Sequence, residues 1–162
     1  MTPLPPLTHA SRLPDWSHLS LEQQVAQLIV VRTTGHLFDQ QIQYPQWEAD
    51  TATLQHLIQE VGVGGVILLG GSAAEVALKT QQLQELASIP LLVAADIEEG
   101  VGQRFAGATW MPPPLAIAAI AQQDLPKAIA LAKAYGQVTA HEAQAIGINW
   151  LLAPVVDVNC NS

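Results

Sequence analysis

Four short apolar runs, each separated from the next by a segment with helical periodicity, constrain the fold of this chain more than any other feature. The runs are Leu28-Ile29-Val30-Val31, Val66-Ile67-Leu68-Leu69, Leu91-Leu92-Val93-Ala94-Ala95 and Trp150-Leu151-Leu152-Ala153. Short, continuous runs of this kind are typical of strands buried on both faces. No hairpin signal lies between them, so they predict parallel strands with helical crossovers in one α/β domain.

The intervening helices are predicted from their caps and from the spacing of apolar residues. They span Leu21–Ala26, Glu48–Glu60, Ala73–Ala87 and a long segment that begins after Asp124 and stops at Gly147. Ser20 and Gln23 form a capping-box pattern at the first helix. Leu131, Tyr135 and Val138 keep helical spacing in the last one. The stretches Thr33–Gln46 and Ile97–Pro114 are predicted as loops, and long loops in compact domains are usually functional.

Composition and the termini limit the class of protein. Residues 1–19 contain four prolines and no signal-peptide pattern, so we expect an N-terminal arm before a domain at 20–162. No apolar run approaches the roughly 18 residues of a membrane span, and the single Cys160 excludes an internal disulfide. The net charge of −8 and the lack of a Lys/Arg cluster argue against nucleic acid and anionic membranes as partners. We expect a soluble, cytoplasmic protein that binds a neutral or cationic small molecule.

Two architectures fit this pattern of elements. One is a small doubly wound sheet, and the other is part of an eight-stranded barrel, which needs about 250 residues when complete. Periodicity does not separate them. Both place their ligands at the carboxyl ends of the strands, so the residues that directly follow the apolar runs are the candidates for a site.

Asp96 is the strongest of these candidates. It follows the third apolar run, and Arg104 lies eight residues further along. A carboxylate accepts hydrogen bonds from sugar hydroxyls, and an arginine adds donors or orients the carboxylate. The alternative is an Asp96–Arg104 ion pair that only fixes the loop. Glu98 and Glu99 suggest a glycosidase pair, but adjacent residues of an extended segment point in opposite directions and cannot flank one bond.

The remaining motifs are weaker. Gly70-Gly71-Ser72 lies between a strand and a helix, where backbone N–H groups can hold an anion, but it lacks the Gly-Lys-Ser/Thr of a phosphate loop and a plain turn is the simpler interpretation. Trp110 either stacks on a sugar ring or packs under its loop. No His, Cys and Asp residues have the spacing of metal ligands, and we expect no metal or cofactor.

Around Asp96 the sequence resembles glycoside hydrolase family 3. The stretch Leu91–Gly100 with Gln103-Arg104-Phe105 is similar to the family pattern Asp-x-Glu-Gly-Gly-Arg-Val-x-Arg. Further matches, in the same order along the chain, are Gly64–Leu68, Ser88–Leu91, Trp110-Met111-Pro112 and Gly147–Val158. The sequence departs from the pattern where Glu99 replaces a glycine and where Val101 replaces an arginine.

The resemblance implies a fold, an activity and two site residues. The implied fold is the N-terminal part, about four βα units, of a TIM-type (β/α)8 barrel. The implied activity is retaining hydrolysis of terminal β-linked sugars, with bacterial β-N-acetylhexosaminidases most similar and β-glucosidases next. An aspartate attacks the anomeric carbon, and a His–Asp pair serves as acid and base. The family's sugar-binding aspartate corresponds to Asp96, and its downstream arginine to Arg104.

The same resemblance implies that this chain has no catalytic residue, because the nucleophile and the acid/base lie downstream of the fourth strand in the family. We therefore expect a truncated barrel, inactive alone, that supplies substrate-binding groups and that either a downstream segment or a second chain completes. The alternatives are a non-catalytic sugar-binding or interaction module, β-glucosidase specificity, and a doubly wound domain that binds an anion at Gly70–Ser72.

Overall fold

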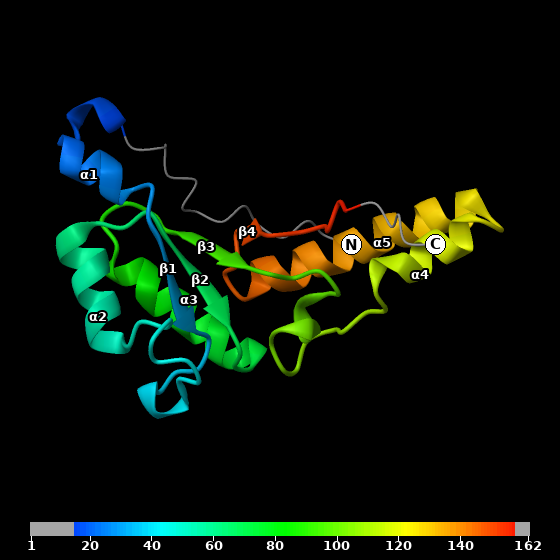
Figure 1. The fold of residues 1–162 in the computed structure, drawn as a ribbon, viewed down its shortest axis with the longest axis horizontal. Coiled ribbons are helices and arrows are strands. Elements are labelled where there is room, and N and C mark those ends of the chain that lie inside the picture. The colour runs from blue at the N-terminus through cyan, green and yellow to red at the C-terminus, as the bar shows by residue number, and fades with distance from the viewer. Residues whose placement is uncertain (1–14, 158–162) are drawn as a thin grey trace.

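The computed structural model describes residues 15–157, which form a parallel four-stranded sheet with its helices (Figure 1). The strands are β1 (Val30–Thr34), β2 (Gly65–Leu69), β3 (Leu92–Ala95) and β4 (Trp150–Leu151), and they lie side by side in the order β1-β2-β3-β4. All three pairings are parallel. A doubly wound sheet reverses its order at a switch point, whereas a barrel keeps chain order, so the topology is that of a barrel.

Within residues 15–157 the strands are accompanied by five α-helices and four shorter helical turns, of which the first turn and the first helix precede β1 and the others connect the strands. The helices are α1 (Leu21–Ala26), α2 (Thr51–His56), α3 (Ala73–Leu86), α4 (Pro114–Ala121) and α5 (Leu125–Ala145). The turns are η1 (Trp16–His18), η2 (Asp39–Gln41), η4 (Val101–Gln103) and the π-helical η3 (Leu57–Val61). The predicted capping box of Ser20 and Gln23 is present, and Asp124 caps α5 through the Lys127 N–H. None of the helices among residues 15–157 is both long enough and apolar enough to span a membrane.

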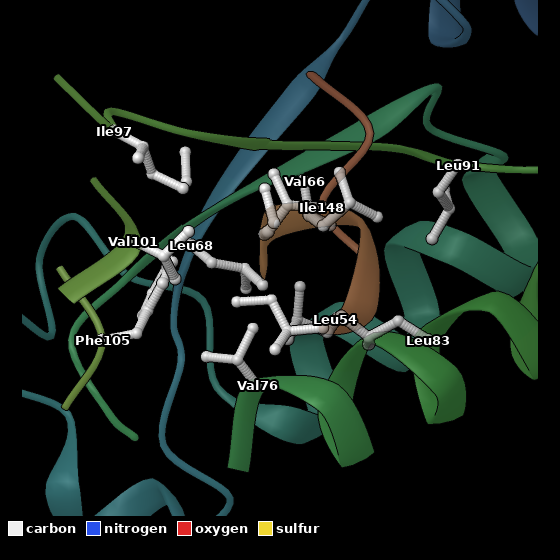
Figure 2. Close-up of a cluster of buried hydrophobic side chains, with 14 of the residues drawn as sticks. Leu54, Val66, Leu68, Val76, Leu83, Leu91, Ile97, Val101, Phe105 and Ile148 are labelled. Carbon is white, nitrogen blue, oxygen red and sulfur yellow. The ribbon is translucent and has the colours of Figure 1, made fainter. Parts of the chain in front are cut away.

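The hydrophobic core lies on one face of the sheet only. Alternate strand residues, including Val66, Leu68 and Val93, are fully buried there against Val76 of α3 and Leu54 of α2 (Figure 2). Because successive strand side chains point to opposite faces, the residues between them point the other way.

The opposite face of the sheet is open. Val30, Leu92 and Trp150 point to it and are 36%, 48% and 40% exposed. A doubly wound sheet carries helices on both faces, whereas the inner face of a barrel is filled by side chains from the whole ring of strands. An apolar, uncovered inner face is therefore what four of eight barrel strands leave exposed.

The first strand differs from its prediction. Leu28–Val31 does not form a buried strand, because the N–H groups of Leu28 and Ile29 bond back to α1 and Leu28 is 84% exposed. β1 instead extends to Thr34, into the predicted loop. Thr33 is buried without a penalty because its hydroxyl donates to the Ala49 carbonyl at 2.9 Å. At the other edge β4 is shorter than predicted, since Pro154 has no N–H with which to continue the ladder.

The helices differ from the predictions at the start of α2 and at α4, whereas the predicted last helix is present as α5. α2 starts later than Glu48, because Asp50 caps it through the Thr53 N–H and Glu48 is buried outside the helix. α4 is absent from the sequence-based predictions, although its first residue, Pro114, is of a type common at the start of helices. In α5 the residues Leu131 and Val138 are 40% and 39% exposed, because the helix extends past the sheet beside α4 (Figure 1).

Candidate functional site

Asp96 lies at the carboxyl end of β3, on the open face of the sheet. Along β3 the side chains alternate between the two faces. Val93 and Ala95 face the core, so Leu92, Ala94 and then Asp96 point to the open face. The Asp96 side chain is 38% exposed. Asp96 thus directly follows β3 at the carboxyl-end edge of the sheet, as the sequence predicts, and its contact with a ligand stays a prediction.

Arg104 holds the backbone of Asp96 more closely than it holds the carboxylate. Its Nε donates to the Asp96 carbonyl oxygen at 2.7 Å, whereas its terminal nitrogen lies 3.8 Å from the Asp96 carboxylate. Both side chains are about one-third exposed, and half-solvated pairs of this kind contribute little to stability. The carboxylate of Asp96 therefore keeps most of its capacity to accept hydrogen bonds from a ligand.

The loop after Asp96 is fixed by side chains that sequence reasoning missed. Gln103 accepts hydrogen bonds from the N–H groups of Glu98 and Glu99 at 2.8 and 3.1 Å. Tyr135 of α5 donates to the Glu98 carbonyl at 2.9 Å, and burial, helped by the charge of Glu99, raises the pKa of its hydroxyl. No local motif signals these contacts, because Tyr135 is distant in sequence.

The two departures from the family pattern have clear structural roles. Val101 is fully buried in the core beside Phe105 (Figure 2), so its side chain anchors the loop. Glu99 accepts a hydrogen bond from the Trp110 indole at 2.9 Å. Trp110 is 69% exposed, so it does not pack under its loop.

The glycine turn after β2 is not an open anion site. Ser72 caps α3, and its N–H and hydroxyl both donate to the Glu75 carboxylate at 2.8 Å. These bonds, the Ser72 hydroxyl first, lower the Glu75 pKa to about 2. The Glu75 carboxylate thus already occupies both Ser72 donors that an external anion would need. This finding, with the strand order, contradicts the doubly wound anion-binding alternative.

A hollow of about 670 Å³ opens over the carboxyl ends of β1 and β2, next to the Asp96 loop. It is lined by Arg32, Gln43, Tyr44, Trp47, Leu69, Gly70, Gln103 and Arg104. Arg32 lies 3.4 Å from the buried Glu48 carboxylate and over the Tyr44 ring. Of the lining residues, Gln43 and Tyr44 lie in the predicted loop Thr33–Gln46, and Trp47 directly follows it. Their clustering depends on the fold of the β1–α2 connection.

The other candidates add no chemistry. Within residues 15–157 no three His, Cys, Asp or Glu side chains are grouped in a way that would hold a metal ion. Cys160, the single cysteine, lies outside the described residues.

A parallel sheet in chain order, with helices on one face and polar residues at the carboxyl ends of its strands, is the N-terminal part of a (β/α)8 barrel. The Glycosyl hydrolase family 3 N terminal domain matches residues 20–162, and the chain belongs to this family.

Relatives and solved structures agree with this membership. The chain is 36% identical over 115 residues to a β-N-acetylglucosaminidase/β-glucosidase of Cellulomonas fimi, and 36% identical over 117 residues to a β-hexosaminidase of Nitrosomonas eutropha. These matches cover 71% and 70% of this chain but 19% and 32% of the relatives. The chain thus spans at most about a third of these relatives.

Two solved structures have a similar fold. A β-glucoside phosphorylase, BglX, bound to 2FGlc has a TM-score of 0.68 at 26% identity, over 90% of this chain and 23% of its own. NagZ from Neisseria gonorrhoeae in complex with N-trifluoroacetyl-D-glucosamine has a TM-score of 0.64 at 25% identity, over 80% of this chain and 37% of its own.

Proposed function

We propose that this chain supplies the substrate-binding groups, and not the bond-breaking groups, of a retaining β-N-acetylhexosaminidase-like glycosidase. In this proposal Asp96 accepts hydrogen bonds from hydroxyls of the sugar being cleaved, and Arg104 positions it. The nucleophile and the acid/base come from outside residues 1–162, on a segment that completes the barrel, either downstream or on a second chain.

The observation that carries the proposal is the position of Asp96. It is a partly exposed carboxylate at the carboxyl end of a barrel strand, where this fold places its ligand, and its loop is fixed by Gln103 and Tyr135. The names of the relatives support a carbohydrate ligand, with N-acetylhexosaminides first and β-glucosides second.

The test joins this chain to the complementary barrel segment of a relative, such as the N. eutropha β-hexosaminidase, and measures kcat/KM on an aryl β-N-acetylglucosaminide. We expect Asp96→Ala to lower kcat/KM about tenfold to a hundredfold, because a charged acceptor for sugar hydroxyls contributes roughly 1.5–3 kcal/mol. Asp124→Ala, which removes a carboxylate from the start of α5, is the matched control. An unchanged kcat/KM in correctly folded Asp96→Ala would remove this residue from the site.

A further inference from the structure

The hollow beside Asp96 has an aromatic wall. Trp47 and Tyr44 line it and are 67% and 50% exposed. The Arg32 guanidinium lies 5.4 Å from the centre of the Tyr44 ring, so Trp47 is the freer of the two rings. A volume of about 670 Å³ falls in the range, roughly 300–1,000 Å³, of small-ligand pockets.

The short segment that carries both rings is held in place by hydrogen bonds. Trp47 N–H donates to the Tyr44 carbonyl at 2.8 Å, and Tyr44 N–H donates to the Glu48 carboxylate at 3.4 Å. The Ala49 N–H donates to the Arg32 carbonyl of β1 at 2.9 Å, which ties the segment to the strand. The segment that carries the aromatic wall is therefore tied to β1 by hydrogen bonds, and binding does not have to order a free loop.

The charges around the hollow are balanced. Arg32 lies 3.4 Å from Glu48, whose side chain is only 3% exposed, and Arg104 lies 3.8 Å from Asp96. Each arginine thus has a carboxylate neighbour, and the hollow offers an anion no net positive charge. The lining combines exposed rings, the amide groups of Gln43 and Gln103, and arginines whose charge a carboxylate balances. This combination suits a neutral ligand that has both apolar faces and hydroxyl groups.

We infer that Trp47 and Tyr44 form a second sugar-binding position, for the neutral pyranose linked to the sugar that Asp96 binds. Arg104 belongs to both positions, since it lines the hollow and bonds the Asp96 carbonyl. The ligand is then a β-linked oligosaccharide of N-acetylhexosamine, with one unit on Asp96 and the next on Trp47. This inference rests on the proposed function of Asp96.

The test measures the affinity of the 162-residue chain for N-acetylglucosamine and for tri-N-acetylchitotriose by saturation-transfer NMR, which tolerates large assemblies. We expect the trisaccharide to bind more tightly than the monosaccharide. Trp47→Ala should lower trisaccharide affinity about two- to tenfold, the effect of one aromatic contact, and leave monosaccharide affinity unchanged. Trp47→Tyr keeps a ring and should restore most of the gain.

Trp16→Ala is the matched control, because Trp16 is 70% exposed but belongs to η1, before α1. Equal affinities for the two sugars, or a trisaccharide affinity that Trp47→Ala leaves unchanged, would overturn the inference, even if Asp96→Ala abolished monosaccharide binding as proposed. A Trp47-dependent gain that survives in Asp96→Ala would uphold the hollow and count against the proposed role of Asp96. No binding of either sugar would contradict both.

Discussion

Arg104 makes two separate interactions with Asp96, one with its backbone carbonyl and one with its carboxylate. The sequence predicts either a ligand-binding carboxylate or an ion pair that fixes the loop. In the structure Arg104 fixes the loop through the Asp96 carbonyl at 2.7 Å, and the carboxylate lies further away at 3.8 Å. The loop contact therefore depends on the arginine and hardly on the Asp96 side chain.

The two residues should accordingly differ in their effect on stability. Arg104→Ala removes a charged donor from a carbonyl, which costs roughly 1.5–3 kcal/mol. Asp96→Ala removes a half-solvated pair, which costs roughly 0–1 kcal/mol. Urea denaturation of the dilute chain checks this. Equal losses from both substitutions would mean that the ion pair itself fixes the loop.

Glu75 gives a prediction for pH dependence. Its pKa falls from 4.5 to about 2 on folding, first because the Ser72 hydroxyl bonds the carboxylate. The stabilisation from a depressed pKa is complete above the unfolded value and is lost as the pH falls through the folded value. We expect this loss between about pH 4.5 and about pH 2.

Glu75→Gln keeps the capping geometry without the charge, so its unfolding free energy should fall less over that interval than that of the parent chain. The control is Glu85→Gln on the same helix, whose carboxylate bonds only the Gln81 side chain at 2.9 Å. Its stability should follow the parent profile. A Glu75→Gln variant with the same acid sensitivity as the parent would show that the Ser72–Glu75 contact is not the cause.

At the end of α5 the backbone conformation and the space available both require a glycine, Gly147. Gly147 has φ of +83°, and a Cβ there would lie 2.3 Å from the Thr80 hydroxyl, which itself bonds the Ile146 carbonyl at 2.9 Å. Gly147→Ala should lower the unfolding free energy by at least about 1 kcal/mol.

Gly136 is the matched comparison within the same helix. It is exposed, and a Cβ there meets nothing within 4 Å, so Gly136→Ala should stabilise the chain by up to about 1 kcal/mol. Thermal melts of the two variants beside the parent test both expectations. Shifts of the same sign would contradict this account of the helix end.

The elements that sequence predicts well are those with local signals. The capping box at Ser20, the cap at Asp124 and the glycine stop at Gly147 are all present. The predicted start of β1 is wrong, because apolarity alone does not distinguish a strand from the exposed turn at Leu28. The hollow was not predicted because Tyr44 and Trp47 meet Arg104 only through the fold.

The open face of the sheet governs the behaviour of the whole chain. Apolar residues such as Leu92 and Trp150 are 48% and 40% exposed on it, and β1 and β4 each have one strand neighbour in the sheet. Exposed strand edges and apolar faces drive association between chains. We therefore expect the isolated chain to self-associate at micromolar concentrations, as measured by light scattering after size-exclusion chromatography. A compact monomer with a sharp, cooperative melt would contradict the half-barrel account.

We propose that the chain contributes binding groups to a glycosidase barrel and no bond-breaking groups. The direct measurement is the hydrolysis of an aryl β-N-acetylglucosaminide by the purified chain, alone and joined to the complementary barrel segment, with each preparation free of host glycosidase. The account predicts no turnover above the uncatalysed rate for the chain alone, and turnover by the joined barrel. Hydrolysis by the 162 residues alone, or none by a correctly folded joined barrel, would contradict it.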